Sequence, residues 1–277
     1  MDDTAHPAFR FLQDIAADLA RGQVSFPTFT QATMHVREVL SIADVDADRV
    51  AHAISTEPLL AARLVRMANS VAMNPSGKAV ADVKSAVVRI GFAAVRSAST
   101  AVALEQLRGR LTDPRHTAFA ERAWRHSLHV AALAHVLAKR LTRLNPDEAL
   151  FAGLVHDIGH FYLLSQASKY PELDARPDAL EDLLADWHPS IGRAVLHDFR
   201  LPEPVLDAVA EHEHGQYRMP LRAIQDVVTV ANLATAATNP VSRYRTVPPG
   251  AVGEPDIARV LADGRDEVEG LVAALAA

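Results

Sequence analysis

The spacing of the apolar residues most constrains the fold of this chain. Apolar residues recur at intervals of three and four, as in Phe11, Ile15 and Leu19, and no strand-like alternation persists for more than a few residues. This period places apolar side chains on one face of a helix. Only 12 of the 277 residues are glycine, which also favours helices. The sequence therefore predicts an all-α protein.

Capping residues and prolines divide this pattern into segments. Asp46, Asp82, Asp113 and Asn145 are placed to cap helix N-termini, and the last two precede prolines suited to a first helical position. The predicted helices cover residues 7–21, 27–40, 46–55, 57–69, 82–91, 92–107, 113–141, 146 to beyond 161, 178–187, 189–199, 203–213 and 220–238, and a short helix closes the chain.

A break at residues 109–114 predicts a two-lobed helical protein. We expect an N-terminal helix extension over residues 1–22 and an N-terminal helical bundle lobe over 23–112. A C-terminal helical lobe follows over 113–238, and 239–277 form a proline-rich loop and a C-terminal helix. Most of the histidines that could carry chemistry lie in the C-terminal lobe.

Composition excludes several classes of function. The chain has no cysteine, so any metal must be held by nitrogen or oxygen. The 28 basic and 34 acidic residues give a net charge of −6, which disfavours a dedicated binder of nucleic acid or of anionic membranes. The acidic N-terminus does not resemble a signal peptide, and no apolar run approaches about 20 residues, the length of a membrane span. These features predict a soluble, cytoplasmic protein.

Histidine is the unusual residue, with 13 copies in a chain that is only 5% aromatic. His156 and Asp157 interrupt an apolar segment, His126 lies 30 residues upstream, and His188 and His212 lie near helix ends. If these segments converge, the side chains suit a divalent transition metal such as iron, manganese, nickel or zinc. A buried His–Asp pair without a metal is the alternative. The remaining candidates are predicted to be surface residues: His129, His135, His197 and His214.

A histidine followed thirty residues later by a His-Asp pair and then by further histidines resembles the HD superfamily of metal-dependent phosphohydrolases. Further segments resemble its HDOD branch, the HD-related output domain of bacterial signalling proteins. These segments are Phe26-Pro27 and residues 54–64, 67–70, 83–91, 124–127 and 152–159. The resemblance covers residues 24–236 and makes the C-terminal lobe HD-like.

The resemblance implies a set of metal ligands. His126, His156 and Asp157 match ligand positions of active HD enzymes, and Asn232 stands where those enzymes have an aspartate. An amide oxygen is a neutral and weaker ligand than a carboxylate.

The cyclic-di-GMP-cleaving HD-GYP branch adds two later histidines, which correspond to His188 and His212. His160 stands where that branch has a lysine, so it is the candidate catalytic cation, although it serves only when protonated. Residues 212–220 lack the Gly-Tyr-Pro signature.

The resemblance thus implies a non-catalytic signalling output module that meets signalling proteins in trans through an exposed apolar patch between the lobes. The alternative is a metal-dependent HD phosphohydrolase that acts on a nucleotide or a cyclic dinucleotide. A sensor that binds a metal or nucleotide without turnover lies between them. The sequence names neither the partner nor the oligomeric state.

Four residues outside the histidine set carry structural predictions. Asn69 is expected to end a helix in a left-handed conformation, and Gly91 to permit a helix stop. Arg63 and Arg122 are expected to be solvated.

Overall fold

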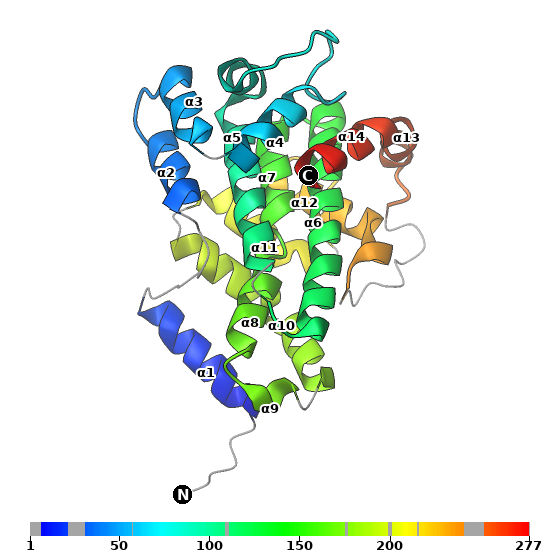
Figure 1. Cartoon of the computed structure of the whole chain (residues 1–277). Helices are drawn as coiled ribbons and strands as arrows, with labels where there is room; N and C mark the ends of the chain where they lie inside the picture. The colour runs from blue at the N-terminus through cyan, green and yellow to red at the C-terminus, as the bar shows by residue number, and fades with distance from the viewer. Residues whose placement is uncertain are drawn as a thin grey trace, which may run out of the picture.

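The fold is entirely helical in the part of the chain that the computed structural model describes, which is residues 7–21, 31–56, 58–108, 111–174, 177–198, 201–214, 216–240 and 252–276 (Figure 1). The helices are α1 (Pro7–Ala20), α2 (Gln31–Leu40), α3 (Ala47–Ser55), α4 (Pro58–Ala68), α5 (Val83–Arg108), α6 (Pro114–Leu141), α7 (Pro146–Val155), α8 (Ile158–Ala167), α9 (Pro171–Asp174), α10 (Pro177–Asp198), α11 (Glu203–Glu211), α12 (Ile224–Ala234), α13 (Pro255–Asp263) and α14 (Arg265–Ala276). Short 3₁₀ turns cover His212–His214 and Ala236–Thr238. The predicted all-α fold is confirmed.

The predicted capping residues begin their helices. Asp46, Asp82, Asp113 and Asn145 each accept a hydrogen bond from a backbone N–H two or three residues further on, at 2.7–2.9 Å. Such a bond satisfies one of the amide groups that a helix N-terminus leaves without a partner.

Several predicted helix boundaries were wrong. A turn at His156 and Asp157 splits the predicted helix into α7 and α8. The two helices predicted on either side of Pro189 form one continuous helix, α10, because its buried residues on both sides hold it against α8 and α11. The chain closes with two helices, α13 and α14, instead of one.

Two groups of helices follow one another along the chain. Helices α2–α5 pack together, and α6, α7, α8, α10, α11 and α12 form a second group, with α5 lying against α7 and α8 (Figure 1). This arrangement fits the expected two lobes. The first helix, α1, packs on α9 and α10, whereas α14 packs on both α6 and α4.

Polar residues of the N-terminal helices form internal hydrogen bonds that the sequence did not predict. Arg63 is buried, and its Nη2 donates to Glu105 Oε2 at 2.5 Å, so the predicted solvation was wrong. Asn69 has no positive φ, so the expected left-handed conformation was wrong. Its side chain instead pairs with the N–H and the C=O of Val80, each at 2.8 Å. Gly91 has φ +75° and kinks α5, as expected for a glycine between two helical runs.

One helix in the described ranges, Val83–Glu105, is long and apolar enough to cross a membrane by length and composition. Core helices of soluble proteins pass the same test, and 61% of this apolar window is buried against other helices. Several predictions lie outside the described residues: the helix end at Gly22, the helix starts at Phe26-Pro27 and Glu57, the break at Gly109, and most of the proline-rich loop.

Candidate metal centre

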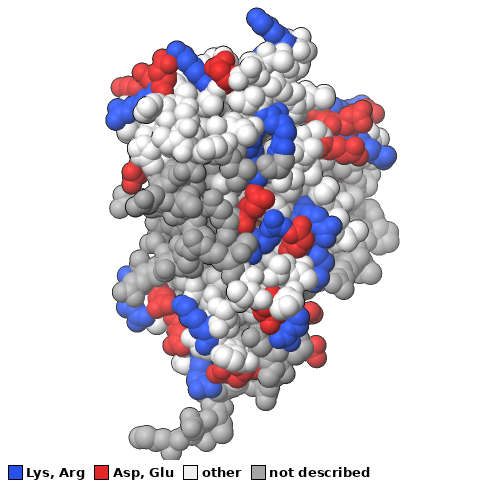
Figure 2. Space-filling model, viewed as in Figure 1, with Lys and Arg blue, Asp and Glu red and all other residues white. Residues whose placement is uncertain are grey.

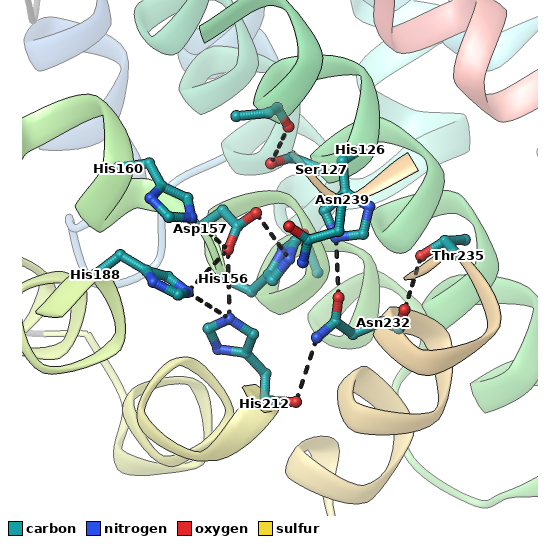
Figure 3. Close-up of polar contacts among 12 residues, drawn as sticks. His126, Ser127, His156, Asp157, His160, His188, His212, Asn232, Thr235 and Asn239 are labelled. Carbon is teal, nitrogen blue, oxygen red and sulfur yellow. Dashed lines mark hydrogen bonds and ion pairs between the residues drawn. The ribbon is translucent and has the colours of Figure 1, made fainter. Parts of the chain in front are cut away.

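The sequence-predicted residues converge in the interior of the second group of helices (Figure 3). All of them are at most 3% exposed. They come from α6, from the turn between α7 and α8, from α8, from α10, from the turn after α11, and from α12. We call these residues the cluster: His126, His156, Asp157, His160, His188, His212 and Asn232.

The turn between α7 and α8 places the His-Asp pair. Asp157 leaves the helical conformation with φ −98° and ψ 14°, so its carboxylate lies beside His156, with Oδ2 3.4 Å from Nε2. Gly159 then lets α10 approach, since a Cβ there would lie 2.0 Å from the backbone oxygen of His188. A side chain at this position would displace His188.

Three imidazoles are held in one tautomer by backbone carbonyls. Nδ1 of His156, His188 and His212 lies 2.7, 2.7 and 2.8 Å from the carbonyl oxygens of Gly153, Leu184 and Val209. A carbonyl only accepts, so each Nδ1–H donates, and in the neutral ring Nε2 keeps a lone pair. Metal-binding histidines in proteins are commonly oriented in this way.

His188, His212 and Asp157 form what we call the triad. The two Nε2 atoms lie 3.2 Å apart, and they lie 3.4 and 3.3 Å from Asp157 Oδ1 (Figure 3). Ligand atoms about 2.0–2.1 Å from one ion are about 3.0–3.4 Å from each other. Two lone pairs this close repel unless a proton or a cation lies between them. Apart from these imidazoles, no described residue donates a hydrogen bond to Asp157, so this donor set fits a metal ion.

The other side of Asp157 is arranged differently. Asn232 Nδ2 donates to His212 O at 3.3 Å and to Glu213 Oε1 at 3.2 Å, which turns Oδ1 toward His126. His126 Nε2 lies 2.9 Å from that oxygen and must carry the proton, while Nδ1 contacts Thr238 Oγ1 at 3.0 Å. A protonated nitrogen has no lone pair for a metal. His126 and Asn232 are therefore hydrogen-bonded to each other and not available to a metal ion, although both lie beside the triad.

Burial sets the charge of the cluster. Loss of water lowers the pKa of His156 to about 3 and the pKa of His188 well below its usual value. Burial alone would raise the pKa of Asp157, but the surrounding imidazoles hold that pKa well below its usual value. At His212, burial acts to lower the pKa, and the contacts with Asp157 and Glu213 outweigh it and raise the pKa. The ionised Asp157 therefore favours a positive charge beside it, which a proton on His212 or a divalent cation supplies.

His160 does not have the properties of the expected catalytic cation. Burial lowers its pKa to about 4, against the opposing effect of Asp157, so the ring is neutral at neutral pH. It stacks on His188 with ring centroids 3.8 Å apart and meets the edge of Phe119 at 5.3 Å. Its Nε2 lies 3.8 Å from Asp157 Oδ1, so the neutral ring packs at the edge of the triad.

Some site residues were missed or misplaced by the sequence analysis. Glu213 and Thr238 complete the network around Asn232 and His126, and only the adjacency of Glu213 to His212 hinted at this. His135 is buried, so the surface prediction was wrong: α7 covers it and brings Asp147 Oδ1 to 3.6 Å from its Nδ1. His197 and His214 are exposed as predicted, and His129 is partly buried.

The all-α fold and the buried His–Asp cluster define an HD-like helical domain. A family model described as the HDOD domain matches residues 26–215, so the chain belongs to the HDOD domain family.

Solved structures share this fold. A candidate metal-dependent phosphohydrolase from Shewanella amazonensis SB2B is 25% identical, with a TM-score of 0.76 over 97% of this chain and 99% of that one. An HDOD domain protein from Geobacter sulfurreducens is 22% identical, with a TM-score of 0.63 over 95% and 96% of the two chains. A candidate signal transduction protein from Marinobacter aquaeolei VT8 is 15% identical, with a TM-score of 0.63 over 100% of this chain and 68% of that one.

A curated relative gives a more limited match. A protein of Treponema pallidum (strain Nichols), described as uncharacterized, is 23% identical over 253 residues. The alignment includes 84% of this chain and 47% of the relative, so the chain spans about half of that protein's length.

Proposed function

We propose that this chain is a non-catalytic bacterial signal-transduction module that acts in the cytoplasm by binding other signalling proteins. Membership of the HDOD family supports the signalling class. The observation that carries the non-catalytic part is the hydrogen bond between His126 Nε2 and Asn232 Oδ1. It occupies the side of Asp157 where the resemblance implies further metal ligands.

The burial of the cluster supports the same proposal. Hydrolysis of a phosphoester requires the phosphoryl group to reach the metal ion. The cluster residues are almost completely inaccessible, so a nucleotide reaches them only if the surrounding helices move apart.

Exposed apolar residues support a role in protein interaction. Val88 and Phe92 lie on either side of the kink in α5 and are 66% and 37% exposed, and Val71, just after α4, is 69% exposed. Exposed apolar side chains that gather on one surface are a common feature of protein interfaces. On the face shown in Figure 2, basic and acidic side chains are interspersed, which does not favour a nucleic acid partner.

An activity assay tests the proposal. With Mn²⁺ or Fe²⁺ supplied, we expect hydrolysis of cyclic di-GMP, of nucleoside phosphates and of a chromogenic phosphodiester to be no faster than with Asp157→Ala. Turnover above that level would refute the non-catalytic assignment. A partner recovered by the wild-type chain should be lost with the double variant Val88→Glu, Phe92→Glu.

The second candidate function is a metal-dependent phosphohydrolase, and the triad is the observation that favours it. Asp157, His188 and His212 would hold the ion, and Glu213, whose Oε1 lies 3.6 Å from His212 Nε2, offers a fourth donor. His156 lies on the other oxygen of Asp157, in a second group with His126. Bound there, iron, manganese, nickel or zinc polarises a phosphoryl oxygen and acidifies a water molecule. Elemental analysis of the purified protein, and of the protein refolded with iron or manganese, tests this candidate, because an ion-free protein cannot have this activity.

A further inference from the structure

A cavity lies beside the cluster, and the residues of the cluster do not line it. It has a volume of about 270 Å³ and is formed by α6, α8 and α10, the helices that carry His126, His160 and His188. Its apolar wall includes Phe119, Leu164 and Leu184. No residue of the triad lines it.

The two arginines that line this cavity differ in their partners. The charged lining residues are Arg115, Arg122 and Glu181. Arg115 already has Asp113 3.4 Å away. Arg122 makes no ion pair within the described part of the chain, and its guanidinium carbon lies 5.7 Å from the centre of the Phe119 ring. The cavity thus combines an apolar wall with one guanidinium that forms no ion pair with Glu181 or with another described carboxylate, and this group can pair with the negative charge of a ligand.

The wall of the cavity also touches the cluster. Phe119 lies edge-on to His160, which stacks on His188, and the carbonyl of Leu184 accepts the Nδ1–H of His188. A molecule in the cavity would press on the residues that orient one member of the triad.

We propose that this cavity binds a small organic acid with an apolar body, such as a medium-chain or aryl carboxylate. The apolar body packs against Phe119, Leu164 and Leu184, and the carboxylate pairs with Arg122. This site goes beyond the signalling role and does not depend on whether the cluster holds a metal or on any catalytic activity.

Isothermal titration of the full chain with octanoate tests the proposal, with octanamide as the neutral analogue of the same length. We expect saturable binding of one octanoate per chain and binding of octanamide weaker by about tenfold, because a hydrogen bond to a charged group contributes more than a neutral one. Equal binding of the two probes, or no saturable binding of octanoate, would overturn it.

Variants locate the binding. Arg122→Gln should weaken octanoate binding about tenfold, whereas Arg125→Gln, on the same helix but outside the cavity lining, should leave it unchanged. Ala118→Phe fills the cavity from an exposed position and should abolish binding. Circular dichroism checks the folding of each variant. Octanoate binding that survives both Arg122→Gln and Ala118→Phe would exclude this cavity.

Discussion

The two oxygens of Asp157 have different surroundings. On the Oδ1 side, the Nε2 atoms of His188 and His212 lie within 3.4 Å of the carboxylate and 3.2 Å from each other, close enough to share one proton or one cation. On the Oδ2 side, His156 lies at 3.4 Å, but the next histidine, His126, is bonded to the amide of Asn232. One amide therefore separates a donor set that fits a cation from one that is closed by internal hydrogen bonds.

The largest expected effect is on metal affinity. His188→Ala removes a nitrogen of the triad and should weaken binding of Mn²⁺ or Zn²⁺ about a thousandfold, or about 4 kcal/mol. His126→Ala should change the affinity less than about threefold, because its Nε2 is already protonated by the bond to Asn232. Competition titration with a chelating dye measures both. An equal loss in the two variants would mean that the two sides of Asp157 act as one site.

Backbone packing allows a second test of the two sides. Gly159→Ala forces a methyl group against the backbone of His188, and Gly153→Ala forces one to within 2.8 Å of the Cα of Ala131. Each should lower the free energy of unfolding by about 3 kcal/mol in urea melts. Only Gly159→Ala should also lower metal affinity, because it displaces the triad. Retention of wild-type affinity by Gly159→Ala would contradict the proposed ligand set.

Asn232→Asp should allow the Oδ2 side of Asp157 to bind a metal ion, as the Oδ1 side is expected to do. The change removes the Nδ2 donor to His212 and Glu213 and adds a carboxylate beside Glu213, so the metal-free protein should lose about 2 kcal/mol of stability. With excess Mn²⁺, elemental analysis should show about two ions per chain in place of about one. Asn239→Asp, which alters another amide that donates to Glu213, is the matched control and should not add an ion. A single ion in Asn232→Asp would show that charge alone does not close this side.

The smallest expected effect is on the pH dependence of stability, and it separates the contribution of the cluster from that of His135, another buried imidazole on α6. Burial lowers the pKa of His135 from 6.5 to about 4, so the unfolded chain takes up a proton that the folded chain does not, and stability falls as the pH falls through this window. Between pH 7 and pH 6 this residue should account for roughly 1 kcal/mol of lost stability. His135→Gln cannot titrate and should lose less over that range in urea melts. An unchanged pH dependence would assign the acid sensitivity to other groups, including the cluster.

Much of the fold could be predicted because its signals are local. A capping aspartate such as Asp113 acts within three residues of itself, and so it marks a helix start without knowledge of the rest of the chain. The turn at His156 and Asp157 gave no such signal, since the apolar residues around it look like one helix.

The candidate site could be predicted only in outline. Histidine spacing and the family resemblance identified the residues that meet, but not which of them keep free lone pairs. The state of His126 depends on the orientation of Asn232, which depends in turn on Glu213 and the backbone of His212. Burial of His135 likewise follows from the packing of α7 on α6, which is a tertiary event.

The packing of α14 against both α6 and α4 has a practical consequence for anyone who divides this chain. Arg66 donates to the carbonyl of Ala274 at 3.0 Å, and Glu267 receives both Lys139 and Arg140. The matched family segment stops at residue 215, before α12 and α14. A fragment that ends at residue 215 would lose both Asn232 and the contacts of α14 with α4 and α6. The segment that matches the family model is therefore shorter than the segment whose helices hold one another in place.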